Sequence, residues 1–421
     1  MIYLDYQATT PLAPEAAAAI RPWLESEFGN PHSSHRLGRQ AAAAVEVARG
    51  RVVAALESIA EAPEPVRVER SRDTPSSEAE TWESLGFARQ GPSTSLGANG
   101  VSHQIPPPSG SFYFTSGATE AINWALKGAA SRLPPDRCRI VTFATEHAAV
   151  LDTVEWLGSQ GFETILLPVA ADGLVSLADV ESAVDARTGL VAAMLVNNEI
   201  GVIQPVAEIG AVARRSGALF LCDAVQGFGR VPIPLDSCDL VAVSAHKVHG
   251  PKGIGGLWVR DGVPLDPLLH GGGQEGGLRS GTLSPALCVG FGEASRLLVE
   301  RADEDRDHVA RLWHAAREAM PGWTLNGSER ARYQGNLNLR RQGVDSSRLI
   351  SEVREVAFSS GSACASGSGR PSHVLAALGL SEREARSSIR LGFGRYTSEE
   401  DLLRALALIE AAASRQLSFA A

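Results

Sequence analysis

The amino-acid sequence predicts an α/β fold with a large, mixed and mostly parallel sheet. Short apolar runs alternate with helical segments, a pattern typical of buried parallel strands joined by crossover helices. The expected strands cover residues 111–114, 139–143, 190–196, 218–222 and 241–243. Each run gives way to polar residues, and in such sheets ligands bind beyond the carboxyl ends of the strands. We therefore expect a functional site where these runs end.

The run at 111–114 leads through a polar turn into a helix that begins near Ala118 and Thr119. The backbone amides at that helix start, together with the positive end of the helix dipole, favour a bound anion. Ser244 and His246 follow another of the expected strands. Any capped helix can start in this way, but the two segments together predict a phosphate site.

The other strand ends carry His147, Asn198, Asp223 and Gln226. A carboxylate such as Asp223, directly after an apolar run, is costly to desolvate unless it has a cationic partner, for example a protonated ring nitrogen. Alternatively, Asp223 caps the helix that follows. His147 is either a core histidine with satisfied hydrogen bonds or a side chain that stacks on an aromatic ring.

Lys247 lies in the polar turn after residues 241–243. Considered alone, it has the character of an ordinary surface lysine. Beside the other strand ends, however, it is well placed to form a Schiff base. A phosphate site, a carboxylate for a ring nitrogen, a stacking histidine and a Schiff-base lysine together indicate pyridoxal 5′-phosphate (PLP).

Cys364 lies in a stretch of small residues, 359–369, without an apolar pattern that would bury it. An exposed free thiol is prone to oxidation and usually has a function, so we expect a mobile nucleophile rather than a chance loop cysteine. The other cysteines are too few and too scattered for a disulfide framework or a zinc site. We expect buried, reduced thiols at Cys138, Cys222, Cys238 and Cys288.

The composition is that of a globular protein. With 421 residues and 44% hydrophobic content, the chain can bury the core of one large or two unequal domains. A net charge of −9, without a basic stripe, argues against nucleic acid as a partner. The sequence lacks a secretory start and an apolar segment of membrane length, so we expect a cytoplasmic protein without membrane contact.

Residues 61–110 differ from the rest of the chain. They are rich in Pro, Gly and Ser and lack a sustained hydrophobic period. Such a composition buries too little apolar surface to offset the entropy lost on ordering. We expect a largely disordered surface insertion that interrupts the surrounding domain.

Several motifs support an identification, and they lie at 3–11, 28–31, 115–120, 145–147, 197–201, 223–226, 246–247, 279–282, 359–369 and 388–390. Jointly they resemble the motifs of PLP-dependent cysteine desulfurases of the NifS/IscS-like group, in the class V aminotransferase family of fold-type I enzymes. The resemblance runs nearly end to end. It implies a large domain over 15–261 and a smaller α+β domain formed by 1–14 and 262–421.

The resemblance also implies how the cofactor is held. Lys247 would carry the Schiff base, Asp223 would pair with the pyridine nitrogen, and Gln226 would bind the ring hydroxyl. His147 would stack on the ring. The residues that would bind the phosphate are Ala118, Thr119, Ser244 and His246, with Thr282 supplied by the partner subunit of a homodimer.

The implied reaction converts L-cysteine to L-alanine. Asn198 and Arg390 would bind the substrate carboxylate, for which an arginine fork is well suited. Cys364 would take the sulfur as a persulfide and pass it to an acceptor protein, for iron–sulfur clusters or thio-cofactors. The alternatives are a selenocysteine lyase or another enzyme of this fold, and a non-catalytic sulfur-relay or scaffold protein.

Overall fold

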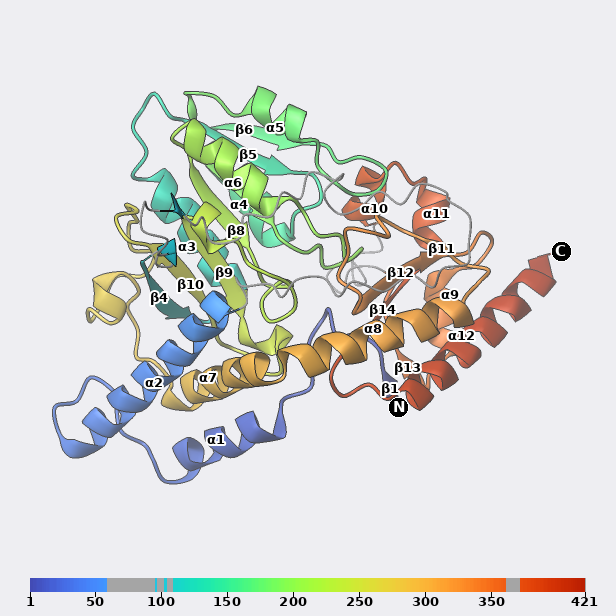
Figure 1. Cartoon of the computed structure of the whole chain (residues 1–421), viewed down its shortest axis with the longest axis horizontal. Helices are drawn as coiled ribbons and strands as arrows, with labels where there is room; N and C mark the ends of the chain where they lie inside the picture. Colours follow the sequence, from blue (N-terminus) through green and yellow to red (C-terminus); the bar gives the residue numbers. More distant parts are fainter. Residues whose placement is uncertain (59–94, 97–101, 104–108, 361–371, 421) are drawn as a thin grey trace.

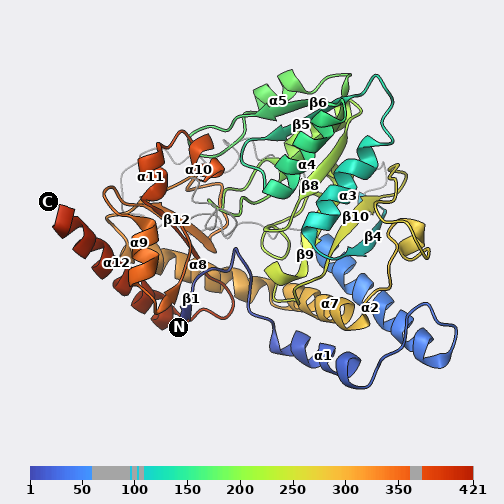
Figure 2. The same ribbon diagram turned by 180° about the vertical axis from the view of Figure 1, so that it is seen from behind.

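The computed structural model describes residues 1–58, 95–96, 102–103, 109–360 and 372–420. Figure 1 shows a large sheet enclosed by helices and, beside it, a smaller C-terminal lobe drawn in orange and red. Seen from behind in Figure 2, the N-terminus also lies against the C-terminal lobe. The first residues of the chain therefore join the part that the last residues build.

The large sheet has seven strands in the order β4-β10-β9-β8-β7-β5-β6. β10 is antiparallel to β4 and β9, and the other neighbouring strands are parallel. This confirms the mixed, mostly parallel sheet expected from the sequence. The strands are β4 (Gly110–Thr115), β5 (Arg139–Phe143), β6 (Glu163–Leu167), β7 (Thr188–Met194), β8 (Leu219–Asp223), β9 (Leu240–Ser244) and β10 (Gly255–Arg260).

Every apolar run expected to be a strand is one, but the sequence analysis does not identify β6 and β10. β6 lies at the edge of the sheet, and its residues alternate between half-buried and exposed, so only its last three residues, 165–167, are apolar. β10 begins with Gly255 and Gly256, and glycine weakens a strand pattern.

Helices cover both faces of the large sheet. Alternate residues of β7 belong to different apolar clusters, with Val191 in one and Leu190 in the other. Because both faces are covered, all of β7 is buried, which explains why the strands form continuous apolar runs. The first cluster includes α2 (Arg36–Ser58), α5 (Leu177–Ala183), α6 (Val206–Arg215) and α7 (Pro285–Glu300), and the second includes α3 (Ala118–Ala130) and α4 (Ala148–Ser159).

The C-terminal lobe has a core of its own, in which Leu337, Ile389 and Leu4 are buried together. Its antiparallel sheet has the order β11-β12-β14, and β1 pairs with β13 in parallel. Its strands are β1 (Ile2–Tyr3), β11 (Thr324–Leu325), β12 (Asn336–Arg340), β13 (Val356–Ala357) and β14 (Ser388–Gly392). Its helices are α8 (Ala302–Ala319), α9 (Ser346–Glu352), α10 (His373–Ala377), α11 (Glu382–Arg386) and α12 (Glu399–Ala420).

Two further helices connect the parts. α1 (Pro14–Glu25) packs on α7, and α7 packs on α2 and places Phe291 in the apolar cluster of the large sheet. The domain boundaries drawn from the sequence stay a prediction. No helix in the described ranges is long and apolar enough to cross a membrane.

The predicted insertion at 61–110 separates α2, which ends at Ser58, from β4, which begins at Gly110. Within it, β2 (Ser95–Leu96) and β3 (Ser102–His103) form an antiparallel pair. The last residue of the predicted insertion, Gly110, already belongs to β4, so the insertion ends earlier than predicted. Residues 61–94, 97–101 and 104–108 lie outside the described residues, and the disorder expected of them stays a prediction.

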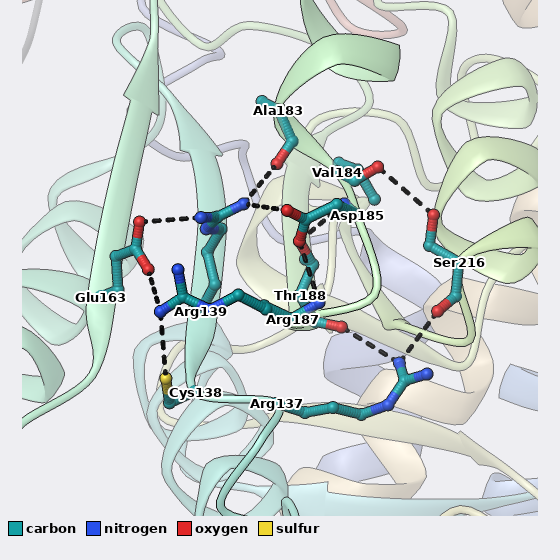
Figure 3. Close-up of polar contacts among 10 residues, drawn as sticks. All are labelled: Arg137, Cys138, Arg139, Glu163, Ala183, Val184, Asp185, Arg187, Thr188 and Ser216. Atoms are coloured by element: carbon teal, nitrogen blue, oxygen red, sulfur yellow. Dashed lines mark hydrogen bonds and ion pairs between the residues drawn. The ribbon is translucent and has the colours of Figure 1, made fainter.

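Ion pairs fasten the amino ends of β5 and β6, as Figure 3 shows. Arg139 lies 3.0 Å from the Glu163 carboxylate and 2.7 Å from that of Asp185. Arg187 adds a second contact to Glu163, at 2.9 Å. These contacts lie at the amino ends of the parallel strands, so the carboxyl ends of the strands remain open for a site.

A buried ion pair covers the outer edge of β4. Arg49 on α2 lies 2.7 Å from the carboxylate of Glu275, whose side chain is only 3% exposed. Glu275 also accepts the backbone N–H of Phe114, and Arg49 donates to the carbonyl of Phe112, at 2.7 and 2.6 Å. The pair therefore satisfies edge groups of the strand that leads into the predicted phosphate turn.

We expect Glu275→Gln to lower the free energy of unfolding by roughly 3 kcal/mol, because it removes the buried partner of Arg49 and leaves that half-buried guanidinium only the exposed carboxylate of Glu46. Urea denaturation measures the change. The matched control is Asp303→Asn, which breaks an exposed pair with Arg306 and should cost less than about 1 kcal/mol. Equal losses in both variants would contradict a special role for the buried pair.

Candidate cofactor site

The carboxyl ends of the parallel strands meet at one edge of the large sheet, and Gly255 draws two of them close together. Gly255 pairs with Thr115 at the end of β4 and with Ser244 at the end of β9. A Cβ atom at this position would lie 2.6 Å from the Val243 carbonyl oxygen and 2.9 Å from the Gly117 backbone. Only glycine therefore lets β10 bring the start of α3 next to Ser244.

The start of α3 is open towards this edge. Gly117 is the N-cap residue and makes no side-chain cap, and a Cβ atom there would meet nothing within 4 Å. Ala118 and Thr119 form the first turn. The Glu120 carboxylate accepts the backbone N–H of Ser116 at 2.6 Å. An open helix start of this kind suits an anion.

Ser244 and His246 lie across Gly255 from that turn. Ser244 is buried at the end of β9, and the His246 ring nitrogen Nδ1 lies 3.2 Å from the hydroxyl of Thr9. Burial, aided by the charge of Lys247, lowers the pKa of His246 to about 4. His246 is therefore neutral at physiological pH and would contact a phosphate as a hydrogen-bonding group rather than as a cation.

Lys247 ends a short 3₁₀ turn, Ala245–Lys247, directly after β9. Its Nζ atom donates to the carbonyl oxygens of Gln7 and Ala8, at 2.5 and 2.9 Å. The sequence analysis gave this N-terminal stretch no role beyond its resemblance. The structure shows that it lies against the predicted Schiff-base lysine.

Asp223 is buried at the end of β8, and its Oδ1 accepts the backbone N–H of Val225 at 3.0 Å. Burial raises the pKa of the Asp223 carboxyl, while the charges of His147 and Lys247 act in the opposite direction. A carboxyl in such a place gains from a further cation beside it. A protonated ring nitrogen would meet that need.

His147 is the N-cap of α4, and its Nδ1 accepts the backbone N–H of Ala149 at 3.1 Å. In the neutral ring the proton therefore lies on Nε2. His147 and Thr119 line the same cavity of about 390 Å³ between α3 and α4. The structure thus brings the predicted stacking residue and the predicted phosphate turn together.

Gln226 and Arg230 form a network around Lys247. The Gln226 Nε2 donates to the Gln7 carbonyl at 2.9 Å, and its Oε1 accepts from Arg230. Arg230 also donates to the Lys247 carbonyl at 2.6 Å. The sequence analysis missed Arg230, because one arginine after a strand carries no signal of its own.

Arg390 reaches from β14 in the C-terminal lobe to the edge of the large sheet, and it is only 1% exposed. It donates to the main-chain carbonyl of Asn198 at 3.0 Å and pairs with Asp5 at 2.8 Å. Its Nε has no partner among the described residues. The two predicted substrate residues do meet, but through the Asn198 backbone, and Asp5 is an addition that sequence reasoning missed.

Cys364 lies outside the described residues, but both flanks of its segment, 361–371, are described. Before it, Ser359 and Arg390 exchange backbone hydrogen bonds of 3.3 and 2.7 Å. After it, the Ser372 hydroxyl donates to Glu199, and the His373 ring lies 2.9 Å from the Glu146 carbonyl. Each flank is therefore fastened to a residue of the site or to its direct neighbour.

Two buried glutamates support these contacts. The Oε1 of Glu146 accepts the backbone N–H of Met194 at 2.9 Å, and its Oε2 has no partner among the described residues. Burial raises the pKa of Glu146 well above its ordinary value. Burial also raises the pKa of Glu199, which the hydrogen bond from Ser372 and nearby cations partly offset.

Thr282 is exposed on the loop between β10 and α7, and its role in a second subunit stays a prediction. Within the described ranges no cluster of His, Cys, Asp or Glu is fit to hold a metal ion.

Of the other cysteines, Cys222, Cys238 and Cys288 are buried free thiols, as expected. Cys138 is only half-buried, and it lies on the loop directly before β5.

The residues at this edge fit PLP. The start of α3 and Ser244 offer an anion cradle, and Asp223 offers a buried carboxylate that favours a cation. Lys247 reaches the same crevice from β9, and its charge acts on the Asp223 carboxyl. The chemistry of this donor set matches a phosphorylated, cationic pyridine ring with an aldehyde.

Comparison with known proteins agrees with this geometry. Residues 101–404 match the family of class-V aminotransferases. A cysteine desulfurase IscS from Rickettsia bellii (strain OSU 85-389) is 40% identical over 417 residues, which cover 97% of this chain and 90% of the relative.

Solved structures give the same result. A NifS-like protein superimposes with a TM-score of 0.81 at 30% identity, covering 98% of this chain and 99% of that one. The structure of SspA in complex with cysteine gives 0.73 at 31% identity, with 94% and 100% covered. The chain therefore belongs to the class-V aminotransferase family, and within it to the PLP-dependent cysteine desulfurases of the IscS and NifS type.

Proposed function

We propose that this protein is a PLP-dependent cysteine desulfurase that converts L-cysteine to L-alanine and transfers the sulfur to Cys364. The Cys364 assignment rests on the hydrogen bonds that hold both flanks of its segment. Ser359 is bound to Arg390, and Ser372 and His373 are bound to Glu199 and Glu146. Both flanks of the segment are thus bound beside the crevice, which supports Cys364 as the residue that would meet a substrate there.

The residues that would hold PLP come from the ends of four strands. Asp223 and Gln226 would bind the ring, His147 would stack on it, and Lys247 would bind its aldehyde carbon. When bound, PLP supplies an electron sink for the substrate α-carbon. The residues that would bind the phosphate are Ala118, Thr119, Ser244 and His246, with Thr282 from the partner subunit of a homodimer.

Arg390 would bind the substrate carboxylate. Its guanidinium is buried, fixed by Asp5 and the Asn198 carbonyl, and retains an unpartnered Nε. A fixed planar fork is suited to bidentate binding of a carboxylate. The related SspA structure holds cysteine, which supports an amino acid with a free carboxylate as the ligand.

Two side chains would handle protons. The Nζ of Lys247 would remove the substrate α-proton, because a neutral lysine amine at this edge can act as a general base. The Nε2 of His147 would exchange a proton with a thiol, since its Nδ1 is occupied by the Ala149 amide. The Cys364 thiolate would then attack the substrate sulfur, and the carbon–sulfur bond would break with alanine as the other product.

The persulfide on Cys364 would pass to an acceptor protein, for iron–sulfur clusters or thio-cofactors, and we place the enzyme in the cytoplasm. A selenocysteine lyase is the nearest alternative, and the relative rates with cysteine and selenocysteine decide between them. If the protein were instead a non-catalytic sulfur-relay or scaffold protein, the purified protein would not take up PLP. The residue set at the sheet edge argues against it.

We expect the purified protein with PLP and a thiol reductant to release sulfide and alanine from L-cysteine in equal amounts. Lys247→Ala and Cys364→Ala should each abolish sulfide release, because one removes the amine and the other the sulfur acceptor. Cys138→Ala is the matched control, since that cysteine lies away from the carboxyl edge, and it should retain full activity. Sulfide release by Cys364→Ala at the wild-type rate would contradict the assignment.

We expect Arg390→Lys to raise the KM for L-cysteine about 10- to 100-fold with a smaller change in kcat, because an ammonium cannot replace the planar fork. Steady-state kinetics measure this. Arg340→Lys, on the neighbouring strand β12, is the control and should leave KM unchanged. A KM like that of the wild type in Arg390→Lys would place the carboxylate site elsewhere.

We expect Glu146→Gln to stabilise the cofactor-free protein more as pH rises. The pKa of Glu146 is raised in the folded state, so the folded protein retains a proton that the unfolded chain releases, and wild-type stability falls with rising pH. The gain of the variant should grow by up to about 1.4 kcal/mol per pH unit above pH 5.

Urea denaturation across pH 5 to pH 8 (roughly the range over which a raised carboxyl pKa acts) tests this expectation. Glu352→Gln is the control, because Arg348 lowers the pKa of that exposed carboxyl, which is therefore ionised in both the folded and the unfolded chain over this range, so its difference from the wild type should not change with pH. A stability difference between Glu146→Gln and the wild type that does not change with pH would show that Glu146 is ionised in the folded protein.

A further inference from the structure

Arg230 is a cation beside the site that has no carboxylate partner among the described residues. Its guanidinium instead donates to the side-chain oxygen of Gln226 and, at 2.6 Å, to the carbonyl of Lys247. It lies over the Tyr333 ring, 5.2 Å from the ring centre. Burial lowers the pKa of Arg230, so its environment opposes the charge.

A charge held in this way is costly unless other interactions compensate it. Both polar partners of Arg230 belong to residues proposed to touch the cofactor, Gln226 and Lys247. A purely structural arginine in the same chain is different. Arg332 is also buried and stacked, over Trp313, but it donates to the carbonyls of Ile200, Asn326 and Ser328, none of which is assigned to the cofactor.

The contact with Arg230 decides which way the Gln226 amide faces. A guanidinium has only donors, so it binds the amide oxygen and turns the amide nitrogen away. That nitrogen gives one N–H to the Gln7 carbonyl at 2.9 Å. Its second N–H is left to donate to another acceptor. Without Arg230 the amide could rotate by half a turn and present its oxygen instead.

We propose that Arg230 is a positioning residue for PLP, which fixes Gln226 as a hydrogen-bond donor to the ring oxygen and fixes the backbone of Lys247. This inference rests on the proposed function, in which Gln226 binds that oxygen. A donor at this point favours the anionic form of the ring oxygen, and the nearby cation adds to the effect.

The charge of Arg230 acts on its surroundings as the proposal requires. Burial is the main cause that lowers the pKa of His246 and of His249, each to about 4, and the charge of Arg230 adds to it, after Lys247 and Lys252 at His246 and after Arg395 at His249. Tyr333 and Asp305 also face this region from the elements packed around it. Asp305, the carboxylate among these groups, makes no hydrogen bond to Arg230.

The test compares holoenzymes of the wild type, Arg230→Gln and Arg230→Lys. We expect Arg230→Gln to raise the PLP dissociation constant about tenfold or more, the effect of losing a hydrogen bond fixed by a charged group. We also expect the pH at which the visible absorption of bound PLP changes to rise, because the variant removes a cation that contacts Gln226 and the Lys247 backbone and that disfavours protonation of the Schiff base. Arg230→Lys retains the charge and should recover that pH.

Two further variants separate positioning from general stability. Arg332→Gln should lower the unfolding temperature without moving the absorption pH, because none of its hydrogen-bond partners is a residue assigned to the cofactor. In a Gln226→Ala background, Arg230→Gln should weaken PLP binding far less than in the wild type, since both changes remove the same contact.

Wild-type PLP affinity and absorption pH in Arg230→Gln would overturn the inference, and so would an equal shift in Arg332→Gln. If Arg230→Gln weakens PLP binding as much in the Gln226→Ala background as in the wild type, Arg230 does not act through Gln226. If Arg230→Gln does not fold, Arg230→Lys is compared in the wild type and in the Gln226→Ala background, where its effect on PLP binding should be smaller. Failure of the wild type to take up PLP would instead contradict the proposed function itself.

Discussion

The site depends on one topological constraint, which is the common direction of the strands β5, β7, β8 and β9. Because neighbouring pairs among them are parallel, the side chains that follow each strand gather at one edge. β10 runs the other way, and Gly255 lets it bring the end of β4 to the same edge. Residues far apart in the sequence can therefore be offered to a cofactor from the ends of neighbouring strands.

The crevice is completed by parts that the large sheet does not supply. The N-terminal stretch lies on Lys247 through the carbonyls of Gln7 and Ala8, and Arg390 comes from the C-terminal lobe to pair with Asp5. The same lobe carries the flanks of the Cys364 segment. Substrate carboxylate and sulfur acceptor would thus be brought to the cofactor by one structural unit, which couples binding to sulfur transfer.

Much of this could be predicted from the sequence, because buried strands form apolar runs and their polar ends mark the crevice. The runs before His147, Asp223 and Lys247 are strands in the structure. The sequence did not predict β6, because an edge strand is only half buried, or β10, because it begins with glycines. It also did not predict the roles of Asp5 and Arg230, because these depend on long-range contacts with Arg390 and Gln226 that no local pattern encodes.

The central claim is that Cys364 accepts sulfur from cysteine bound at this edge. The most direct measurement is mass spectrometry of the holoenzyme after incubation with L-cysteine and no reductant, followed by digestion. The account predicts one added sulfur atom on the peptide that contains Cys364, absent when Lys247 is replaced. Added sulfur on a peptide containing Cys138, or alanine formed with the Cys364 peptide unmodified, would contradict it.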